Sequence, residues 1–283
     1  MPCLVDFRPM KIVNTITEMK ALKLPRPVGF VPTMGYLHEG HLSLVRAAKA
    51  ENKSVVASIY VNPTQFAPTE DLAKYPRDLE KDFRLIEAYT NVVWTPTAEI
   101  MYPTGYQTWV DVEAMTRPLE GAMRPGHFRG VTTVVAKLFN AVQPHKAYFG
   151  QKDAQQVAVI RQMVRDLNFP LEIVVCPTMR EPDGLAMSSR NVYLDPEQRK
   201  AATVLFRSLS AAKGLYEVGE RNAQVIRKKM KEVLASEPLA EPQYVSCADY
   251  DTLEELDEIK GKALLSMAVY FGKTRLIDNF ILG

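Results

Sequence analysis

Short apolar runs alternate with segments of helical spacing over the first two-thirds of the chain. The predicted strands are 28–31, 54–61, 91–94, 147–149 and 171–176, and the predicted helices begin near 40 and 78 or cover 130–142 and 153–167. Strands that are separated by helices pair in parallel through right-handed crossovers. The pattern therefore predicts an α/β fold with helices flanking a parallel sheet.

The pattern changes after residue 176. The segment Asp195-Pro196-Glu197-Gln198 is typical of a helix start, with Asp as N-cap, Pro in the first turn and Gln three residues after the cap. Helical spacing continues to about residue 235. Three strands are then predicted at 244–249, 264–270 and 275–279, the last two joined as a hairpin. We therefore expect a larger domain at 1–176 and a smaller C-terminal α+β domain at 177–283.

Composition limits the possible functions of this chain. Its 283 residues are 47% hydrophobic and 24% charged, which is an ordinary globular balance, and the net charge is only +2. Acids and bases are interleaved, so no block of charge favours nucleic acid or a membrane surface as partner. We find neither a signal-peptide core nor a membrane-spanning segment. Cys3, Cys176 and Cys247 lack CxxC spacing, which argues against disulfides and zinc. We expect a cytoplasmic protein.

The candidate chemistry begins in the segment 30–42. A strand ends there, Gly35 and Gly40 mark a turn, and a helix begins near Gly40. The first turn of a helix has unpaired N–H groups and a partial positive charge, so it binds anions well. His38 and His41 lie at this helix start, and an imidazole can donate to a phosphate oxygen. The arrangement resembles the His-x-Gly-His signature of nucleotidyl-transfer enzymes with a Rossmann-like sheet.

Ligands of parallel sheets bind beyond the carboxyl ends of the strands. Five loops follow predicted strands, namely 32–41, 62–66, 96–105, 150–153 and 177–190. Lys152 lies in the fourth loop, where we favour a phosphate contact over the solvated position that most lysines occupy. Ser188-Ser189-Arg190 lies in the fifth, either as a polar loop or as a phosphate clamp, since the guanidinium fork suits phosphate.

Six segments together resemble the successive motifs of the pantothenate synthetases, the pantoate–β-alanine ligase family. They occur in the family's order and are 32–41, 61–66, 75–77, 124–131, 149–156 and 184–191. The resemblance implies an ATP-dependent ligase that joins pantoate to β-alanine through an enzyme-bound pantoyl-adenylate. AMP and pyrophosphate would be the products of this reaction.

The resemblance also implies roles for particular residues. His41 is implied as the residue that handles a proton or stabilises charge, with His38 beside it, and the other implied catalytic residues are Lys152, Ser188, Ser189 and Arg190. The implied pantoate contacts are Asn62, Gln65 and Gln156. The implied ATP contacts are Met34, Gly35, His38, Gly40, His41, Gly150, Lys152, Asp153, Met179, Met187, Ser188, Ser189 and Arg190. Asp153 could hold the ribose hydroxyls or cap the next helix. We interpret His127 and His145 as structural.

ATP also implies Mg²⁺, which is mostly held by phosphates. The sequence contains no carboxylate cluster with metal spacing, so we expect Mg²⁺ to arrive with the nucleotide and expect no metal site of the protein's own. The resemblance implies a homodimer, an ATP- and pantoate-binding domain at 1–176, and a lid domain at 177–283 that closes over ATP.

One residue departs from the family pattern, and two other functions remain open. Gln151 stands where the Gly-Glu-Lys-Asp form of the motif has an acidic residue. The first alternative function is a nucleotidyltransferase that acts on another small substrate and keeps the adenylate as product. The second is a non-catalytic nucleotide-binding module.

Overall fold

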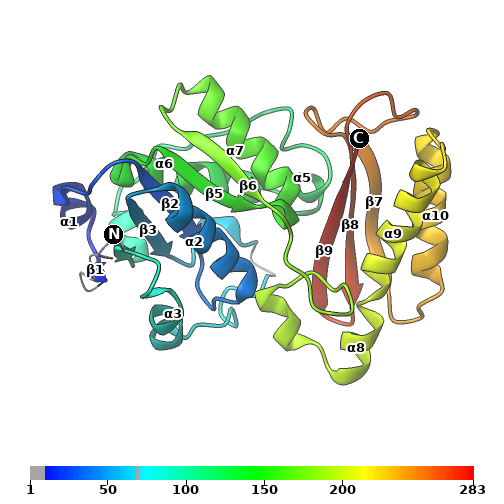
Figure 1. Cartoon of the computed structure of the whole chain (residues 1–283), viewed down its shortest axis with the longest axis horizontal. Helices are drawn as coiled ribbons and strands as arrows, with labels where there is room; N and C mark the ends of the chain where they lie inside the picture. Colours follow the sequence, from blue (N-terminus) through cyan, green and yellow to red (C-terminus); the bar gives the residue numbers. More distant parts are fainter. Residues whose placement is uncertain (1–9, 68–69) are drawn as a thin grey trace, which may run out of the picture. The chain divides into compact units, whose positions relative to one another are not determined.

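A computed structural model describes residues 10–67 and 70–283, which divide into two compact units (Figure 1). The first unit contains the described residues up to Val112, together with Gly126–Phe149 and Ile160–Cys176. The second unit contains Glu113–Pro125, Gly150–Val159 and Pro177–Gly283. The chain therefore passes into the second unit at 113 and at 150 as well as at 177.

The first unit is built on a six-stranded parallel sheet with the strand order β1-β4-β3-β2-β5-β6. The central strand β2 pairs in parallel with β3 on one side, and on the other side with β5. The strands are β1 (Lys11–Val13), β2 (Val28–Thr33), β3 (Ser54–Ile59), β4 (Val92–Trp94), β5 (Lys146–Gly150) and β6 (Glu172–Cys176).

Both faces of this sheet are covered, which explains why its strands are continuous apolar runs rather than alternating ones. On one face, Val31 belongs to a buried cluster with Val45 of helix α2 (Glu39–Glu51) and Ile86 of helix α3 (Leu79–Ile86). The next residue back along the strand, Phe30, packs edge to face against Phe139 of helix α6 (His127–Val142), with 6.3 Å between ring centroids. Successive residues of β2 thus contact helices on opposite faces.

The remaining elements of the first unit are short. Helix α1 (Ile16–Ala21) begins with a capping box formed by Thr15 and Glu18. Neither this helix nor the three-residue edge strand β1 is among the elements that the sequence pattern predicts. The others are the 3-10 turn η1 (Pro63–Gln65), α4 (Ala98–Met101) and the second half of α7 (Ala154–Asp166).

The second unit contains a three-stranded antiparallel sheet with the order β7-β8-β9. Alternate residues of β8, such as Leu265, Met267 and Val269, pack against the buried sides of the two long helices α9 and α10. The hairpin turn at 272–273 is the one that the sequence predicts. The elements are η2 (Gln151–Asp153), η3 (Ser189–Tyr193), α5 (Glu120–Met123), α8 (Pro196–Ala201), α9 (Val204–Glu217), α10 (Ala223–Ala235), β7 (Glu241–Asp249), β8 (Ala263–Phe271) and β9 (Thr274–Leu282).

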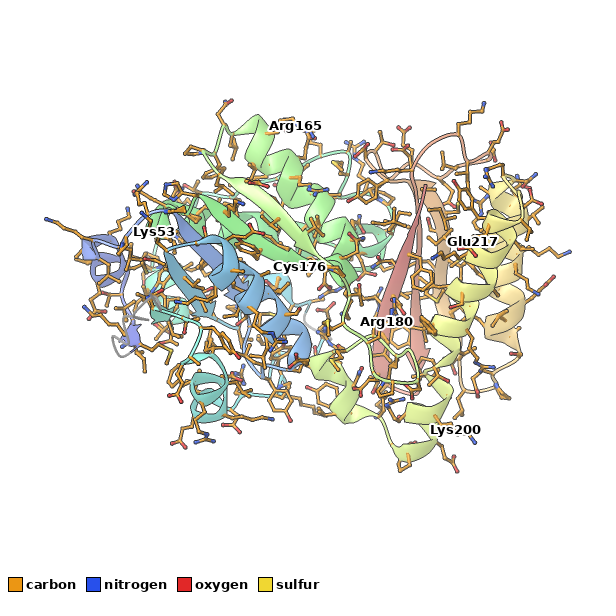
Figure 2. All side chains as sticks on the ribbon, in the orientation of Figure 1. Lys53, Arg165, Cys176, Arg180, Lys200 and Glu217 are labelled. Carbon is orange, nitrogen blue, oxygen red and sulfur yellow. The ribbon has the colours of Figure 1, made fainter. Side chains whose placement is uncertain are left out.

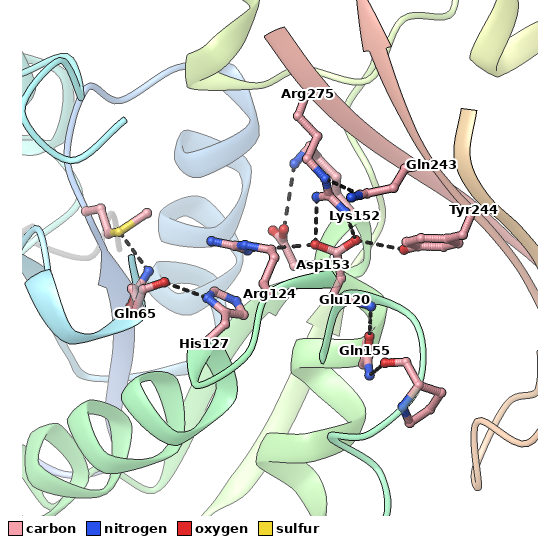
Figure 3. A network of polar contacts seen from close by, with 12 residues as sticks. Gln65, Glu120, Arg124, His127, Lys152, Asp153, Gln155, Gln243, Tyr244 and Arg275 are labelled. Atoms are coloured by element: carbon pink, nitrogen blue, oxygen red, sulfur yellow. Dashed lines mark hydrogen bonds and ion pairs between the residues drawn. The ribbon is translucent and has the colours of Figure 1, made fainter. Parts of the chain in front are cut away.

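The buried carboxylate of Glu120 connects segment 113–125 to this antiparallel sheet (Figure 3). Arg275 of β9 donates to both of its oxygens, with Nη–Oε distances of 2.8 and 2.7 Å, and the Tyr244 hydroxyl of β7 donates at 2.8 Å. The Gln155 side chain accepts from the backbone N–H of Glu120 and donates to the carbonyls of Met115 and Pro118. These bonds explain why segments 113–125 and 150–159 belong to the second unit.

The fold class predicted from the sequence agrees with the structure. The parallel sheet with flanking helices and the smaller C-terminal antiparallel sheet are both confirmed. The Asp195 capping box is present, and Asp78 caps α3 at the predicted position. No described helix is long and apolar enough to cross a membrane. Cys176, at the end of β6 (Figure 2), and Cys247 are free and buried, whereas Cys3 lies outside the described residues.

Substitution of Glu120 tests the buried network through its pH dependence. Burial raises the pKa of Glu120, but the hydrogen bonds and charge of Arg275 outweigh burial and hold the pKa below its usual value. A lowered folded-state pKa stabilises the fold above the unfolded-state pKa of about 4.3, and this stabilisation is lost as pH falls through the folded-state pKa. We expect Glu120→Gln to cost about 3–5 kcal/mol near pH 7, and the cost to shrink below about pH 4.

Urea denaturation from pH 3 to pH 8 measures this difference in free energy of unfolding. Glu80→Gln is the control, because the Glu80 side chain is 90% exposed and its substitution leaves the profile unchanged. A cost for Glu120→Gln that stays constant at all pH values would contradict the assignment.

Candidate active site

The strand order of the parallel sheet reverses between β2 and β5. The chain proceeds from β2 through β3 to β4 on one side, and then returns to place β5 and β6 on the other. Ligands of such sheets bind beyond the carboxyl ends of the strands at this reversal. The loop after β2 leads into α2, and the chain after β5 continues into η2. The topology therefore selects the same two loops that the sequence motifs indicate.

The loop after β2 contains a tight turn that is held by a buried acid. Gly35 and Tyr36 have positive φ angles of 83° and 51°. The carboxylate of Asp82, which is 1% exposed, accepts from the backbone N–H groups of Tyr36 at 2.8 Å and Leu37 at 2.7 Å. Burial raises the pKa of Asp82, against the opposing effect of these two bonds. The turn directs the chain into α2.

Two imidazoles cap the start of α2. His38 is the N-cap residue, and its Nδ1 accepts from the N–H of Gly40 at 3.1 Å. Nδ1 of His41 accepts in turn from the N–H of His38 at 3.3 Å, and the two ring centroids are 4.2 Å apart. A neutral imidazole that accepts at Nδ1 carries its proton on Nε2. The fold therefore sets one tautomer for both rings and places two Nε2–H donors at the positive end of a helix.

The loop after β3 brings Asn62 and Gln65 together. The Nδ2 of Asn62 donates to Oε1 of Gln65 at 3.2 Å and to the carbonyl of Gly130 at 3.1 Å. The Tyr102 hydroxyl donates to Oδ1 of Asn62 at 3.1 Å. The Nε2 of Gln65 lies 2.9 Å from the sulfur of Met34. Both amides are buried, so their orientations are set by these contacts rather than by water.

Helix α6 packs against the loop that contains Asn62 and Gln65. Nδ1 of the buried His127, the first residue of α6, lies 2.8 Å from the carbonyl oxygen of Gln65. Gly130 is close to the loop as well, because a Cβ added there would lie 2.4 Å from the carbonyl oxygen of Thr64. His127 thus contacts the backbone of a predicted pantoate residue (Figure 3). Gly130 permits the close approach of helix and loop.

The second unit holds the other predicted residues. In η2 the Lys152 Nζ lies 3.6 Å from a carboxylate oxygen of Asp153, and the Lys152 side chain is 20% exposed. Gln156 follows one turn later in α7 and is half-buried. In segment 177–190, the N–H of Met187 donates to the carbonyl of Met179 at 2.9 Å, which closes a short hairpin.

The end of that segment forms a polar 3-10 turn. The Ser188 hydroxyl caps η3 by accepting from the N–H of Arg190 at 3.2 Å. Ser189 is buried and Arg190 is half-buried. Within 10–67 and 70–283, no group of three or more His, Cys, Asp or Glu residues could hold a metal ion.

Comparison with known proteins adds to this geometry. Residues 11–281 match the sequence family described as Pantoate-beta-alanine ligase. The chain belongs to this family. It is 60% identical to the pantothenate synthetase of Roseiflexus castenholzii over 276 residues, which cover 96% of this chain and 99% of that protein. It is therefore an enzyme that condenses pantoate with β-alanine.

Solved structures agree with this assignment. A pantothenate synthetase from Thermus thermophilus has a TM-score of 0.93 at 50% identity, covering 96% of this chain and 99% of that one. A pantoate-beta-alanine ligase from Francisella tularensis, described as complexed with beta-gamma ATP and beta-alanine, has a TM-score of 0.78 at 35% identity, with coverages of 96% and 97%. Membership in the family decides for the ligase over the two alternative functions.

Some supporting residues of this ligase escape prediction from sequence. Asp82 left one usable signal, because it lies four residues before the buried Ile86 and so on the same face of α3. Tyr102 left none, since the residue that it contacts, Asn62, lies 40 positions away in the sequence. The sequence marked loop 96–105 as a candidate ligand-binding loop. In the structure, Tyr102 of this loop donates a hydrogen bond to Asn62.

Substitution of Gly130 tests the close approach of α6 to the loop of Gln65. The added methyl of Gly130→Ala displaces the Thr64 carbonyl, so we expect a loss of about 1–3 kcal/mol in free energy of unfolding and a raised KM for pantoate. Gly214→Ala in α9 is the matched control, because a Cβ there meets nothing within 4 Å. It should stabilise the protein by about 0.5–1 kcal/mol. Urea denaturation measures the free energy of unfolding of both variants, and steady-state kinetics measure their KM for pantoate. A Gly130→Ala variant with unchanged stability would refute the packing argument.

Proposed function

We propose that this ligase first uses ATP to convert pantoate to an enzyme-bound pantoyl-adenylate, with release of pyrophosphate. The amine of β-alanine then attacks the acyl carbon of the adenylate and displaces AMP. The observation that carries the proposal is the paired Nδ1 capping of His38 and His41, which places both imidazoles, with their protons on Nε2, at a helix start. The Francisella tularensis relative described as complexed with beta-gamma ATP and beta-alanine supports the choice of substrates.

The first step needs charge stabilisation more than covalent chemistry. Attack of the pantoate carboxylate on the α-phosphorus increases negative charge on the phosphoryl oxygens, and preorganised donors lower that barrier. We assign this role to His41, assisted by His38. Further donors and cations come from Lys152, Ser188, Ser189 and Arg190, and the remaining ATP contacts are Met34, Gly35, Gly40, Gly150, Asp153, Met179 and Met187.

Gly150 fits a role at a ligand. Its φ of −84° is open to any residue, and a Cβ there would meet nothing within 4 Å of the protein. Neither backbone conformation nor packing therefore requires glycine at this position. A glycine also permits the close approach of a ligand to the backbone.

Pantoate binding is assigned to Asn62, Gln65 and Gln156. Because Oε1 of Gln65 accepts from Asn62, its Nε2 is left as the donor. That donor faces the Met34 sulfur, which is a weak acceptor, and we assign to it a carboxylate or hydroxyl oxygen of pantoate. The contact of His127 with the Gln65 carbonyl holds the backbone in place during this exchange.

The remaining expectations are proposed on the same basis. Mg²⁺ enters as part of the ATP substrate, coordinated mainly by phosphate oxygens. The enzyme works as a homodimer in the cytoplasm, which suits the free thiols of Cys176 and Cys247.

One assay tests the proposed reaction. The protein is incubated with ATP, pantoate and Mg²⁺, with and without β-alanine, and AMP and pantothenate are measured. We expect AMP release that depends on the amine, with pantothenate formed in equal amount. Folded protein that releases no AMP in response to β-alanine would refute the two-step proposal.

Alanine substitutions test the proposed catalytic residues. We expect His41→Ala and Lys152→Ala each to slow adenylate formation by about two to three orders of magnitude, as for lost transition-state donors. ATP affinity should fall much less. Single-turnover kinetics and equilibrium ATP binding separate the two quantities, and equal losses in both would contradict a role in the transition state.

Gln65→Ala tests the pantoate assignment. Loss of the donor at Nε2 should raise the KM for pantoate by about 10-fold to 100-fold, while ATP affinity stays near that of the wild type. Steady-state kinetics at saturating ATP measure the first quantity, and calorimetric titration with ATP measures the second. A large loss of ATP affinity would show that Gln65 serves the nucleotide instead.

A further inference from the structure

The side chain of Asn279 holds the loop that carries Lys152. Asn279 lies in β9, and its Nδ2 donates to two backbone carbonyls of η2, at 3.0 Å to Gln151 and at 2.8 Å to Lys152. Its Oδ1 accepts from the Nε2 of Gln151 at 3.1 Å. Asn279 is only 4% exposed, so water does not compete for these bonds. We call this set of three bonds the Asn279 clamp.

The clamp requires an amide at position 279. Two carbonyl oxygens accept from its nitrogen and one N–H group donates to its oxygen, so the orientation of the amide is determined by its partners. An aspartate of the same shape would offer no donor to either carbonyl. Gln151, which stands where we expected an acidic residue, contributes a donor that a carboxylate lacks.

The neighbouring residue on the strand holds a second loop. Asp278 is 1% exposed, and both of its oxygens accept from Arg180, at 2.7 and 2.8 Å. Arg180, which lies beside β9 (Figure 2), also donates to the carbonyl of Gly184 at 2.9 Å. Successive residues of a strand point to opposite faces. One dipeptide thus reaches η2 on one face and segment 177–190 on the other.

The strand that carries the clamp is itself well fixed. β9 pairs with β8 along its whole length, with Asn279 opposite Ser266 and Asp278 opposite Met267. Arg275, four residues earlier on the same face as Asn279, forms the buried pair with Glu120. The clamp therefore transmits the rigidity of the antiparallel sheet to the η2 backbone.

We propose that Asn279 is a positioning residue for Lys152: by fixing the carbonyls of Gln151 and Lys152, it places the lysine ammonium for adenylate formation. The inference rests on the proposed role of Lys152 in that step. A lysine side chain has four rotatable carbon–carbon bonds, so the location of its backbone limits where its charge can act. Small displacements of a reacting group cost about 10²-fold in rate.

A double-mutant cycle tests the inference. Asn279→Ala removes the clamp, Lys152→Ala removes the ammonium, and the double variant combines them. We expect Asn279→Ala to slow single-turnover adenylate formation by about 10-fold to 100-fold, with the KM for ATP changed less than about threefold. In the Lys152→Ala background, the same change should slow the reaction by less than about threefold.

The control is Gln151→Ala, which removes one bond of the clamp but leaves both bonds to the backbone carbonyls. It should keep adenylate formation within about threefold of the wild type. Thermal unfolding confirms that each variant is folded at the assay temperature. Should Asn279→Ala fail to fold, Asn279→Leu replaces it, because leucine keeps a branched side chain of similar size and removes the donors without burying a charge.

The outcomes are distinguishable. If Asn279→Ala slows the reaction by the same factor with and without Lys152, Asn279 does not act through Lys152 and the inference is overturned, while the proposed function stands. If Lys152→Ala alone reacts at the wild-type rate, the proposed role of Lys152 fails and the inference fails with it. If Asn279→Ala slows adenylate formation only in protein that contains Lys152, the result supports both the role of Lys152 and the positioning role of Asn279.

Discussion

The parallel pairing of β2 with β3 on one side and β5 on the other is the constraint on which the rest of this structure depends. It sends the chain out of β2 and β5 at one edge of the sheet, at the point where strand order reverses. The His-x-Gly-His segment follows the first of these strands and the Lys152 segment follows the second. Strands with apolar residues on both faces make this pairing stable, since each face is covered by helices.

Buried polar side chains hold the loops that follow these strands. Asp82 accepts from two N–H groups of the turn before α2, and Asn279 donates to two carbonyls of η2. Glu120 anchors segment 113–125 through Arg275. Burial of each polar group costs free energy unless its bonds are made, so each stabilises only one arrangement of its loop. The turn before α2, η2 and segment 113–125 are thereby held by contacts with residues that are distant in the sequence.

The start of α2 combines capping with chemistry. Ser, Thr, Asp and Asn are the preferred N-cap residues, whereas this helix uses His38, with His41 completing the capping box. An imidazole cap satisfies backbone N–H groups through Nδ1 and keeps its own proton on Nε2. The same hydrogen bonds that begin the helix therefore set the tautomer that the proposed contact with a phosphoryl oxygen needs.

The sequence by itself determined the elements with long local patterns: the buried strands, the longer helices, the Asp195 helix start and the His-x-Gly-His segment. It also determined the family, because six motifs occur in order along the chain. Only the tertiary structure decided the strand order and the polar partners. Asp82 bonds to residues 45 and 46 positions away, Asn279 to residues 127 and 128 away, and Arg275 to one 155 away. Sheet register and helix packing determine which residues become partners in such bonds. Neither leaves a periodic pattern in the sequence that would identify the partner.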